Sequence, residues 1–274
     1  MPDASPKRLP SYAISHGGGP WPWMTDAMGV DWGPLEASLA AIPGELPEPP
    51  KSVLMVTAHW ETDTFTVQGH ATPSMIYDYG GFPPETYEIV YPAPGQPQVA
   101  GRAAELLAAA GLPTVVDPDR GFDHGTFVPA YVMYPDADVP IVQLSILASF
   151  DPALHLAAGR ALAPLRDEGV LIVGSGLPSY HNLSSMGAEG IEPSRAFDAW
   201  LTETMVGYGG AERSQRLARW ATAPGARQAH PREDHFVPLL VAVGAAESDD
   251  AVRQYHEDSM FGQITSSGYR LDAA

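Results

Sequence analysis

The residues best suited to chemistry in this sequence are histidines that follow predicted strands. The apolar run 53–58 is typical of a strand buried on both faces, and it leads directly into His59, Trp60 and Glu61. In open α/β sheets ligands bind outside the carboxyl ends of the strands, so a histidine at this edge can bind a metal or transfer a proton. Taken alone, His59 is equally well explained as the polar end of a buried strand.

The other histidines change that balance, because most of them occupy similar places. Of the nine histidines, six lie in loops beside predicted strand or helix ends, often next to glycine or proline: His16, His59, His124, His181, His230 and His235. Loops that follow parallel strands share one edge of a sheet, so at least the first four are expected to converge. The remaining three, His70, His155 and His256, are interpreted as structural.

A cluster of imidazoles predicts a metal centre. The sequence has no cysteine, so any metal must be held by nitrogen and oxygen ligands, which favours Fe(II), Zn(II), Mn(II) or Cu(II) over Ca or Mg. Six histidines exceed what three or four ligand positions require, and the surplus indicates acid–base or substrate-orienting roles. The chain has neither an HExxH nor a GxSxG motif, so neither a zincin protease nor a serine hydrolase is supported.

Composition excludes several partners. With 15 basic against 33 acidic residues, the formal net charge is -18, which argues against binding to nucleic acid or to an anionic membrane. No apolar stretch approaches the ~20 residues that span a bilayer. The first ten residues lack the apolar region of a secretory signal, so a cytoplasmic location is expected.

Strands and helices alternate along the chain, which predicts one α/β domain with a largely parallel or mixed central sheet covered by helices and an active site in the strand-end loops. We assign residues 1–10 to a flexible leader, 11–262 to the catalytic domain and 263–274 to a C-terminal tail. The oligomeric state is left open, a homo-oligomer included. Strands are expected at 11–15, 53–58, 64–68, 114–116, 141–146 and 170–174, and helices at 32–42, 98–110, 152–166, 195–206, 212–220 and 236–246.

Six short motifs give a more specific indication because they occur in one order. They are Ser15-His16-Gly17-Gly18-Gly19-Pro20, Ala58-His59-Trp60-Glu61, Gly81-Phe82-Pro83-Pro84-Glu85, Asp123-His124-Gly125-Thr126, His181-Asn182-Leu183 and His230-Pro231-Arg232-Glu233-Asp234-His235-Phe236. Together they resemble the class III extradiol ring-cleavage dioxygenases, in the branch named for DOPA 4,5-dioxygenase. The resemblance runs from about residue 11 to residue 246. Its main departure is the segment 177–180 before His181.

The resemblance implies a set of roles. It places the metal ligands at His16, His59 and His235, with Fe(II) as the metal, although Zn(II) can occupy such a site in a purified protein. It makes His181 the acid–base residue and His124 a contact to substrate or oxygen. His230 is then expected to contact the substrate or a ligand. The implied reaction uses O2 to open the ring of a catechol next to its hydroxyls, giving a semialdehyde acid.

The substrate pocket is less well defined by the sequence. Aromatic residues suitable for a ring-sized pocket are Trp60, Tyr77, Phe82 and Tyr180, and an anionic catechol acid would need a nearby cation, for which Arg120, Arg195 and Arg232 are candidates. Two other functions remain open. One is a zinc-dependent hydrolase that uses the same histidines, and the other is a non-enzymatic binding protein like the Memo-like proteins.

Overall fold

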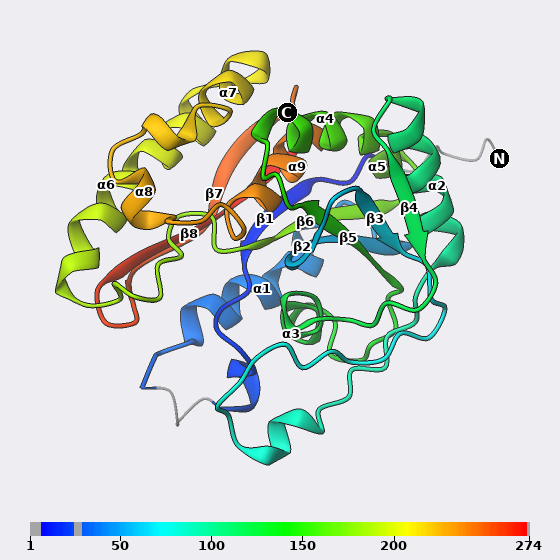
Figure 1. The fold of residues 1–274 in the computed structure, drawn as a ribbon, viewed down its shortest axis with the longest axis horizontal. Coiled ribbons are helices and arrows are strands. Elements are labelled where there is room, and N and C mark those ends of the chain that lie inside the picture. Colours follow the sequence, from blue (N-terminus) through cyan, green and yellow to red (C-terminus); the bar gives the residue numbers. More distant parts are fainter. Residues whose placement is uncertain (1–6, 25–28, 273–274) are drawn as a thin grey trace.

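The computed structural model describes residues 7–24 and 29–272 and has an eight-stranded mixed sheet at its centre (Figure 1). The strand order across the sheet is β4-β3-β5-β2-β6-β1-β8-β7. The strands are β1 (Ser11–Ser15), β2 (Ser52–Thr62), β3 (Phe65–Gln68), β4 (Thr114–Asp117), β5 (Ile141–Leu147), β6 (Val170–Gly176), β7 (Asp250–Met260) and β8 (Ile264–Asp272). The α/β architecture with a mixed sheet confirms the predicted fold class.

The four central strands run in the same direction. β2 pairs in parallel with both β5 and β6, and β6 pairs in parallel with β1. Antiparallel pairing is confined to the flanks, between β3 and β5, β1 and β8, and β7 and β8. The carboxyl ends of β1, β2, β5 and β6 therefore open at one edge of the sheet, where a ligand site is expected.

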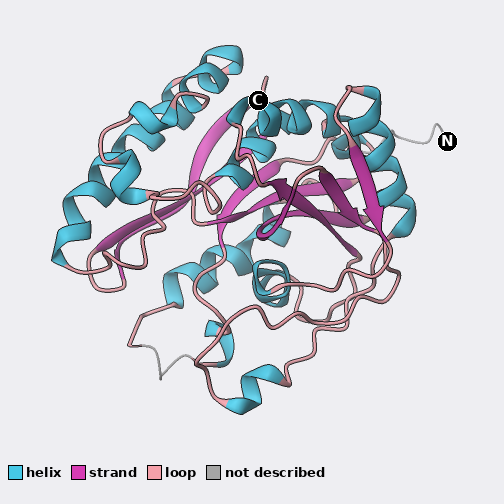
Figure 2. Ribbon diagram, in the orientation of Figure 1, coloured by secondary structure: helices cyan, strands magenta, loops and turns pink. Residues whose placement is uncertain are grey.

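Helices cover both faces of this sheet (Figures 1 and 2). α2, α4, α5 and α9 lie on one face, α1 and α3 on the other, and α6, α7 and α8 beside the β7–β8 hairpin. The helices are α1 (Gly33–Glu45), α2 (Pro97–Ala109), α3 (His124–Met133), α4 (Pro152–Leu162), α5 (Pro164–Asp167), α6 (Ala188–Gly207), α7 (Gly210–Leu217), α8 (Ala226–Ala229) and α9 (Val237–Ala245), with short 3-10 turns at Trp21–Trp23, Pro84–Tyr87 and Trp220–Thr222.

The central strand β2 has apolar side chains on both of its faces. Leu54 and Val56 pack with the α9 side of the core, whereas Val53 and Met55 pack with the α1 and α3 side, and all four are fully buried. Burial of each such side chain contributes roughly 1.5–3 kcal/mol to folding. The strand buried on both faces that the apolar run predicted is present, and it forms the rigid support for His59.

The C-terminal part of the chain differs from the prediction. Residues assigned to a tail form the whole of β8, which pairs with β1 and so lies inside the sheet next to the site. The strand was missed because its buried positions include Thr265, Ser266 and Ser267, so it lacks an apolar run. The domain therefore extends at least to residue 272. The predicted leader is described only from residue 7, and there Leu9 is buried and its amide donates to the Arg166 carbonyl at 3.2 Å.

Candidate metal centre

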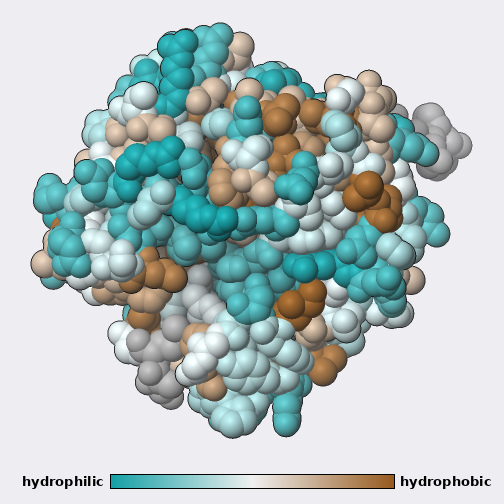
Figure 3. All heavy atoms as spheres, in the orientation of Figure 1, coloured by the Kyte–Doolittle hydropathy of each residue, from teal (hydrophilic) through white to brown (hydrophobic). Residues whose placement is uncertain are grey.

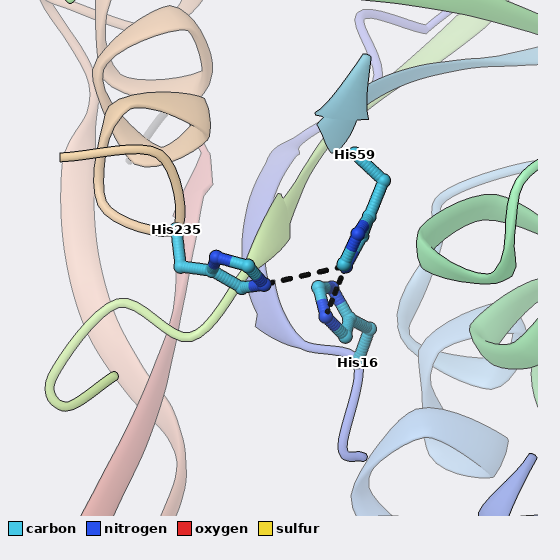
Figure 4. Close-up of side chains that lie close together, drawn as sticks. All are labelled: His16, His59 and His235. Carbon is cyan, nitrogen blue, oxygen red and sulfur yellow. Dashed lines mark hydrogen bonds between the residues drawn. The ribbon is translucent and has the colours of Figure 1, made fainter. Parts of the chain in front are cut away.

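Three histidines from distant parts of the chain meet at the carboxyl edge of the sheet (Figure 4). His16 directly follows β1, His59 lies within β2, and His235 lies just before α9. The Nε2 atom of His59 is 3.2 Å from Nε2 of His16 and 3.2 Å from Nε2 of His235. The three ring nitrogens thus share one small space and can hold one metal ion.

Local backbone features aim these rings. β2 continues beyond the predicted end at residue 58, and its register against β5 shifts between Val56 and Glu61, which is where His59 projects. Gly176, at the end of β6, accepts a hydrogen bond from the His16 amide at 3.0 Å. A Cβ on Gly176 would lie 2.3 Å from the His235 carbonyl oxygen, so only glycine permits this close approach of the end of β6 to the backbone of His235.

Each ligand ring is held by an acceptor at its other nitrogen. Nδ1 of His59 lies 3.2 Å from Asp78, and Nδ1 of His235 lies 2.9 Å from Asp234. Nδ1 of His16 lies 3.2 Å from the Ser175 hydroxyl, which itself donates to the Gly125 carbonyl. Because that hydroxyl proton is already engaged, the Ser175 oxygen accepts from His16. All three rings therefore carry their proton on Nδ1.

This arrangement directs three Nε2 lone pairs at one another. Two unprotonated nitrogens 3.2 Å apart cannot form a hydrogen bond with each other, so three converging lone pairs suit a shared cation. Burial and the neighbouring imidazoles lower the pKa of His16 and of His235 well below the usual value, so these two rings are neutral at pH 7. Three neutral imidazoles without thiolates fit a divalent ion such as Fe(II), Zn(II) or Mn(II).

The pKa of His59 shows the effect of its carboxylate neighbours. Burial lowers it, but the hydrogen bond to Asp78 and the charges of Asp123 and Asp234 outweigh burial and raise it. The same carboxylates strengthen the electron donation of a ligand imidazole.

Two further histidines flank the three converging rings. His124 is the first residue of α3, and its Nδ1 donates to Asp78 at 2.7 Å, so Asp78 holds both His124 and His59. His181 stacks on His235 with ring centroids 3.5 Å apart, and burial lowers the pKa of His181 to about 4. Burial also lowers the pKa of His124, so both rings are neutral at pH 7 and available as proton acceptors.

These groups line one cavity of about 690 Å³. The structure brings five predicted histidines and one predicted aromatic residue into its wall: His16, His59, His124, His181, His235 and Phe82. The rest of the described lining comes from the glycines 17–19 and from Ala58, Glu61, Asp78, Tyr79, Leu177, Leu183, Arg232, Asp234 and Phe261.

His230 is the predicted histidine that the structure does not bring to the cavity. It is fully buried, and its Nε2 donates to the Pro178 carbonyl at 3.2 Å. Its ring packs among Phe197, Trp220 and Phe236. It contributes to the packing beneath the 230–235 loop.

Three of the predicted pocket aromatics also lie outside the cavity wall. Trp60 is nearly buried under the guanidinium of Arg120, which sits 4.7 Å from its ring centroid. Tyr77 lines a separate surface cavity and donates to the Ile89 carbonyl at 2.7 Å. Tyr180 is buried and donates to the Ser185 carbonyl.

Sequence reasoning missed the acceptors that orient the ligands, namely Asp78, Asp234 and Ser175. Asp234 could have been suspected because it directly precedes His235 in a polar motif. Asp78 lies in an aromatic loop distant in sequence from both of its histidine partners, and nothing in the sequence pairs them.

The sequence also matches a known protein family. The family model described as the catalytic LigB subunit of aromatic ring-opening dioxygenase matches residues 31–271. The chain belongs to this family. His59, His124, His181 and His235 fall within the matched residues of this LigB-family protein, and His16 precedes them.

Relatives agree with this assignment. A protein named Dioxygenase tasH from Hapsidospora irregularis is 43% identical over 91% of this chain and 82% of its own length. Proteins named 4,5-DOPA dioxygenase extradiol are 43% identical in Beta vulgaris, over 80% of this chain and 81% of theirs, and 38% identical in Escherichia coli K12, over 74% and 75%. The crystal structure of an uncharacterized E. coli K12 protein is 30% identical, with a TM-score of 0.77 over 97% of this chain and 100% of that one.

The predicted resemblance is confirmed, and this LigB-family protein is an extradiol ring-cleaving dioxygenase. The comparisons favour this activity over a zinc hydrolase or a Memo-like binding protein. Within the described residues, no helix combines the length and the hydrophobicity needed to traverse a bilayer.

Proposed function

We propose that the protein binds Fe(II) through His16, His59 and His235 and uses O2 to cleave the ring of a catechol. The observation that carries this proposal is the convergence of three Nε2 atoms whose rings are each fixed by an acceptor at Nδ1. Bound Fe(II) would supply a centre at which the catechol oxygens and O2 are held together, which makes their reaction intramolecular. A cytoplasmic location and a homo-oligomeric state remain predictions.

His181 is proposed as the residue that accepts a proton from a catechol hydroxyl. Its ring lies in the cavity wall, stacked on a ligand, and its low pKa keeps it neutral and receptive at pH 7. The amide of His181 donates to the Ala229 carbonyl at 2.9 Å, which anchors the loop that carries it. The proton taken at this ring is later available for return to the product.

His124 is proposed to orient the substrate or oxygen. Because its Nδ1–H donates to Asp78, its Nε2 is an acceptor, and its ring centroid lies 4.0 Å from that of His59. Phe82 and Tyr79 supply apolar wall for a single aromatic ring, and burial raises the pKa of Tyr79 to about 12, which keeps it neutral. The positions of His230, Trp60, Tyr77 and Tyr180 do not support direct contact with the substrate.

The test is anaerobic reconstitution with Fe(II), Zn(II) or Mn(II), followed by measurement of O2 uptake with DOPA, caffeate, protocatechuate and gallate. We expect uptake and a new yellow chromophore with the Fe(II) protein, and loss of both in His59→Ala and His181→Ala. Failure of every catechol to consume O2 in the Fe(II) protein, together with tight Zn(II) binding, would contradict the proposal.

A further inference from the structure

The mouth of the cavity carries an ion pair that the proposed reaction does not use. Glu61, near the end of β2, and Arg232, in the 230–235 loop, both line the cavity. The Arg232 Nη1 donates to Glu61 at 2.6 Å, and Nη2 donates to the second carboxylate oxygen. The side chain of Arg232 is 55% exposed and that of Glu61 is 28% exposed, whereas His16 is 1% exposed. The pair therefore stands at the solvent side of a buried histidine floor.

The edge of the Arg232 guanidinium that would bind a substrate carboxylate is already occupied. Its guanidinium is engaged with Glu61 through both terminal nitrogens, which is the geometry that would otherwise grip a ligand carboxylate. A carboxylate oxygen of Asp234 also lies 3.7 Å from Nη1. The central carbon of the guanidinium lies 4.7 Å from the ring centroid of Phe150. These partners fix the side chain against two carboxylates and an aromatic face.

The charged groups of the cavity wall are mostly negative. Among the residues that the structure describes, the lining has three carboxylates, Glu61, Asp78 and Asp234, and one basic side chain, Arg232. The exterior adds to this field, because the chain has a formal net charge of -18. Figure 3 shows hydrophilic side chains interspersed with hydrophobic patches over one face of the molecule.

The other two arginines considered for binding an anionic substrate are not available at the cavity. Arg120 donates to Asp123 at 3.0 Å and lies over Trp60, outside the cavity lining. Arg195 is on α6 and lies 3.9 Å from Glu192, also outside it.

We propose that this cavity selects catechols whose side chain carries an ammonium group over catechols whose side chain carries a carboxylate, and that Glu61 is the discriminating residue. The inference rests on the proposed function, because a ring held by its two hydroxyls at the histidine floor directs a para substituent toward the mouth. There an ammonium group meets the Glu61 carboxylate, beside the Asp234 carboxylate that also approaches Arg232. A carboxylate meets the same charges and an arginine that is already paired.

A matched substrate series tests this selectivity. Dopamine, 4-propylcatechol and dihydrocaffeate have similar shapes and carry a positive, zero and negative side chain. We would measure kcat/KM by O2 uptake in the Fe(II) protein, and Kd by anaerobic titration of the Zn(II) protein, in which ring opening does not obscure binding. At low salt we expect dopamine to be favoured over dihydrocaffeate by about tenfold, with the neutral compound between them, and added NaCl to reduce the ratio.

Two variants test whether Glu61 causes this selectivity between dopamine and dihydrocaffeate. Glu61→Gln removes the negative partner and releases Arg232, so dopamine should bind more weakly and dihydrocaffeate more tightly, which shifts their ratio by about tenfold. Asp63→Asn is the matched control, since Asp63 is exposed in the turn after β2 and lies outside the cavity lining. It makes the same change in net charge and should leave the ratio unchanged.

The outcomes separate this inference from the proposed function. Equal or tighter binding of dihydrocaffeate by the unaltered protein would overturn the inference, as would a Glu61→Gln variant whose ratio matches that of Asp63→Asn. If the Fe(II) protein consumes no O2 with these three or with the four catechols of the earlier test, the proposed function fails, and the Zn(II) titrations still decide the selectivity. Failure of all three to bind would overturn both.

Discussion

His230 and His235 belong to one short motif, yet they occupy opposite environments. His235 has a carboxylate at Nδ1 and directs Nε2 at two other imidazoles in the cavity. His230 has a backbone carbonyl at Nε2 and aromatic rings around it. Each ring keeps one nitrogen lone pair. That of His235 faces two imidazole nitrogens, whereas Nδ1 of His230 is buried with no hydrogen-bond partner among the described residues. The partners of a ring decide its role, and the motif does not.

Substitution of His235 and of His230 should give the largest difference in metal content and in kcat/KM. We expect His235→Ala to lose stoichiometric metal and to lower kcat/KM by more than about 100-fold, because one of three Nε2 ligands is gone. His230→Leu should keep its metal content and turnover. Metal analysis together with O2 uptake measures both effects, and metal loss in His230→Leu would make the two histidines equivalent and break the comparison.

Removal of an orienting carboxylate should have a smaller effect on the metal centre. Asp78 accepts from Nδ1 of both His59 and His124, and an amide oxygen in Asp78→Asn cannot replace both charged contacts. We expect metal affinity to fall by roughly 10- to 100-fold, measured by competition with a chelator. Asp63→Asn serves again as the control. Unchanged affinity in Asp78→Asn would mean that the ligand rings are fixed by packing alone.

The buried position of His230 predicts a pH-dependent stability. Burial lowers its pKa to about 3, so the unfolded chain binds a proton there below about pH 6.5 while the folded chain does not. The contribution of neutral His230 to the free energy of unfolding is therefore complete above pH 6.5 and is lost as the pH falls toward 3. His230→Leu should reduce the pH slope of the unfolding free energy by about 1.4 kcal/mol per pH unit, as measured by urea unfolding between pH 6.5 and pH 4. An unchanged slope in His230→Leu would mean that a residue other than His230 takes up this proton on unfolding.

The smallest effect is expected where an aromatic residue lies behind the cavity wall. Tyr180→Phe removes one buried hydrogen bond to Ser185 and should cost about 1 kcal/mol of stability without changing KM. Phe82→Ala, in the wall itself, should raise KM for the same catechol. A raised KM in Tyr180→Phe would instead place Tyr180 in contact with substrate.

Much of the sheet could be read from the sequence because its signals are local. The apolar run of β2 alternates between two cores, so burial on both faces follows from composition alone. β7 and β8 gave no such signal, since β7 is an edge strand with alternating exposed residues and β8 buries serine and threonine. Hydrogen bonding to neighbouring strands, and not side-chain hydrophobicity, places β8 in the sheet.

The sequence by itself determined that histidines gather at the carboxyl edge of an α/β sheet, because neighbouring residues in the sequence specify strand ends and glycine-rich turns. It also excluded thiolate ligands, since the chain has no cysteine, and so pointed to histidine and carboxylate donors for the predicted metal centre. Only the tertiary structure decided which histidines face one another, that Asp78 holds two of them, and that Arg232 is already paired. Those outcomes depend on contacts between residues far apart in the chain, such as Glu61 with Arg232, and no local pattern specifies them.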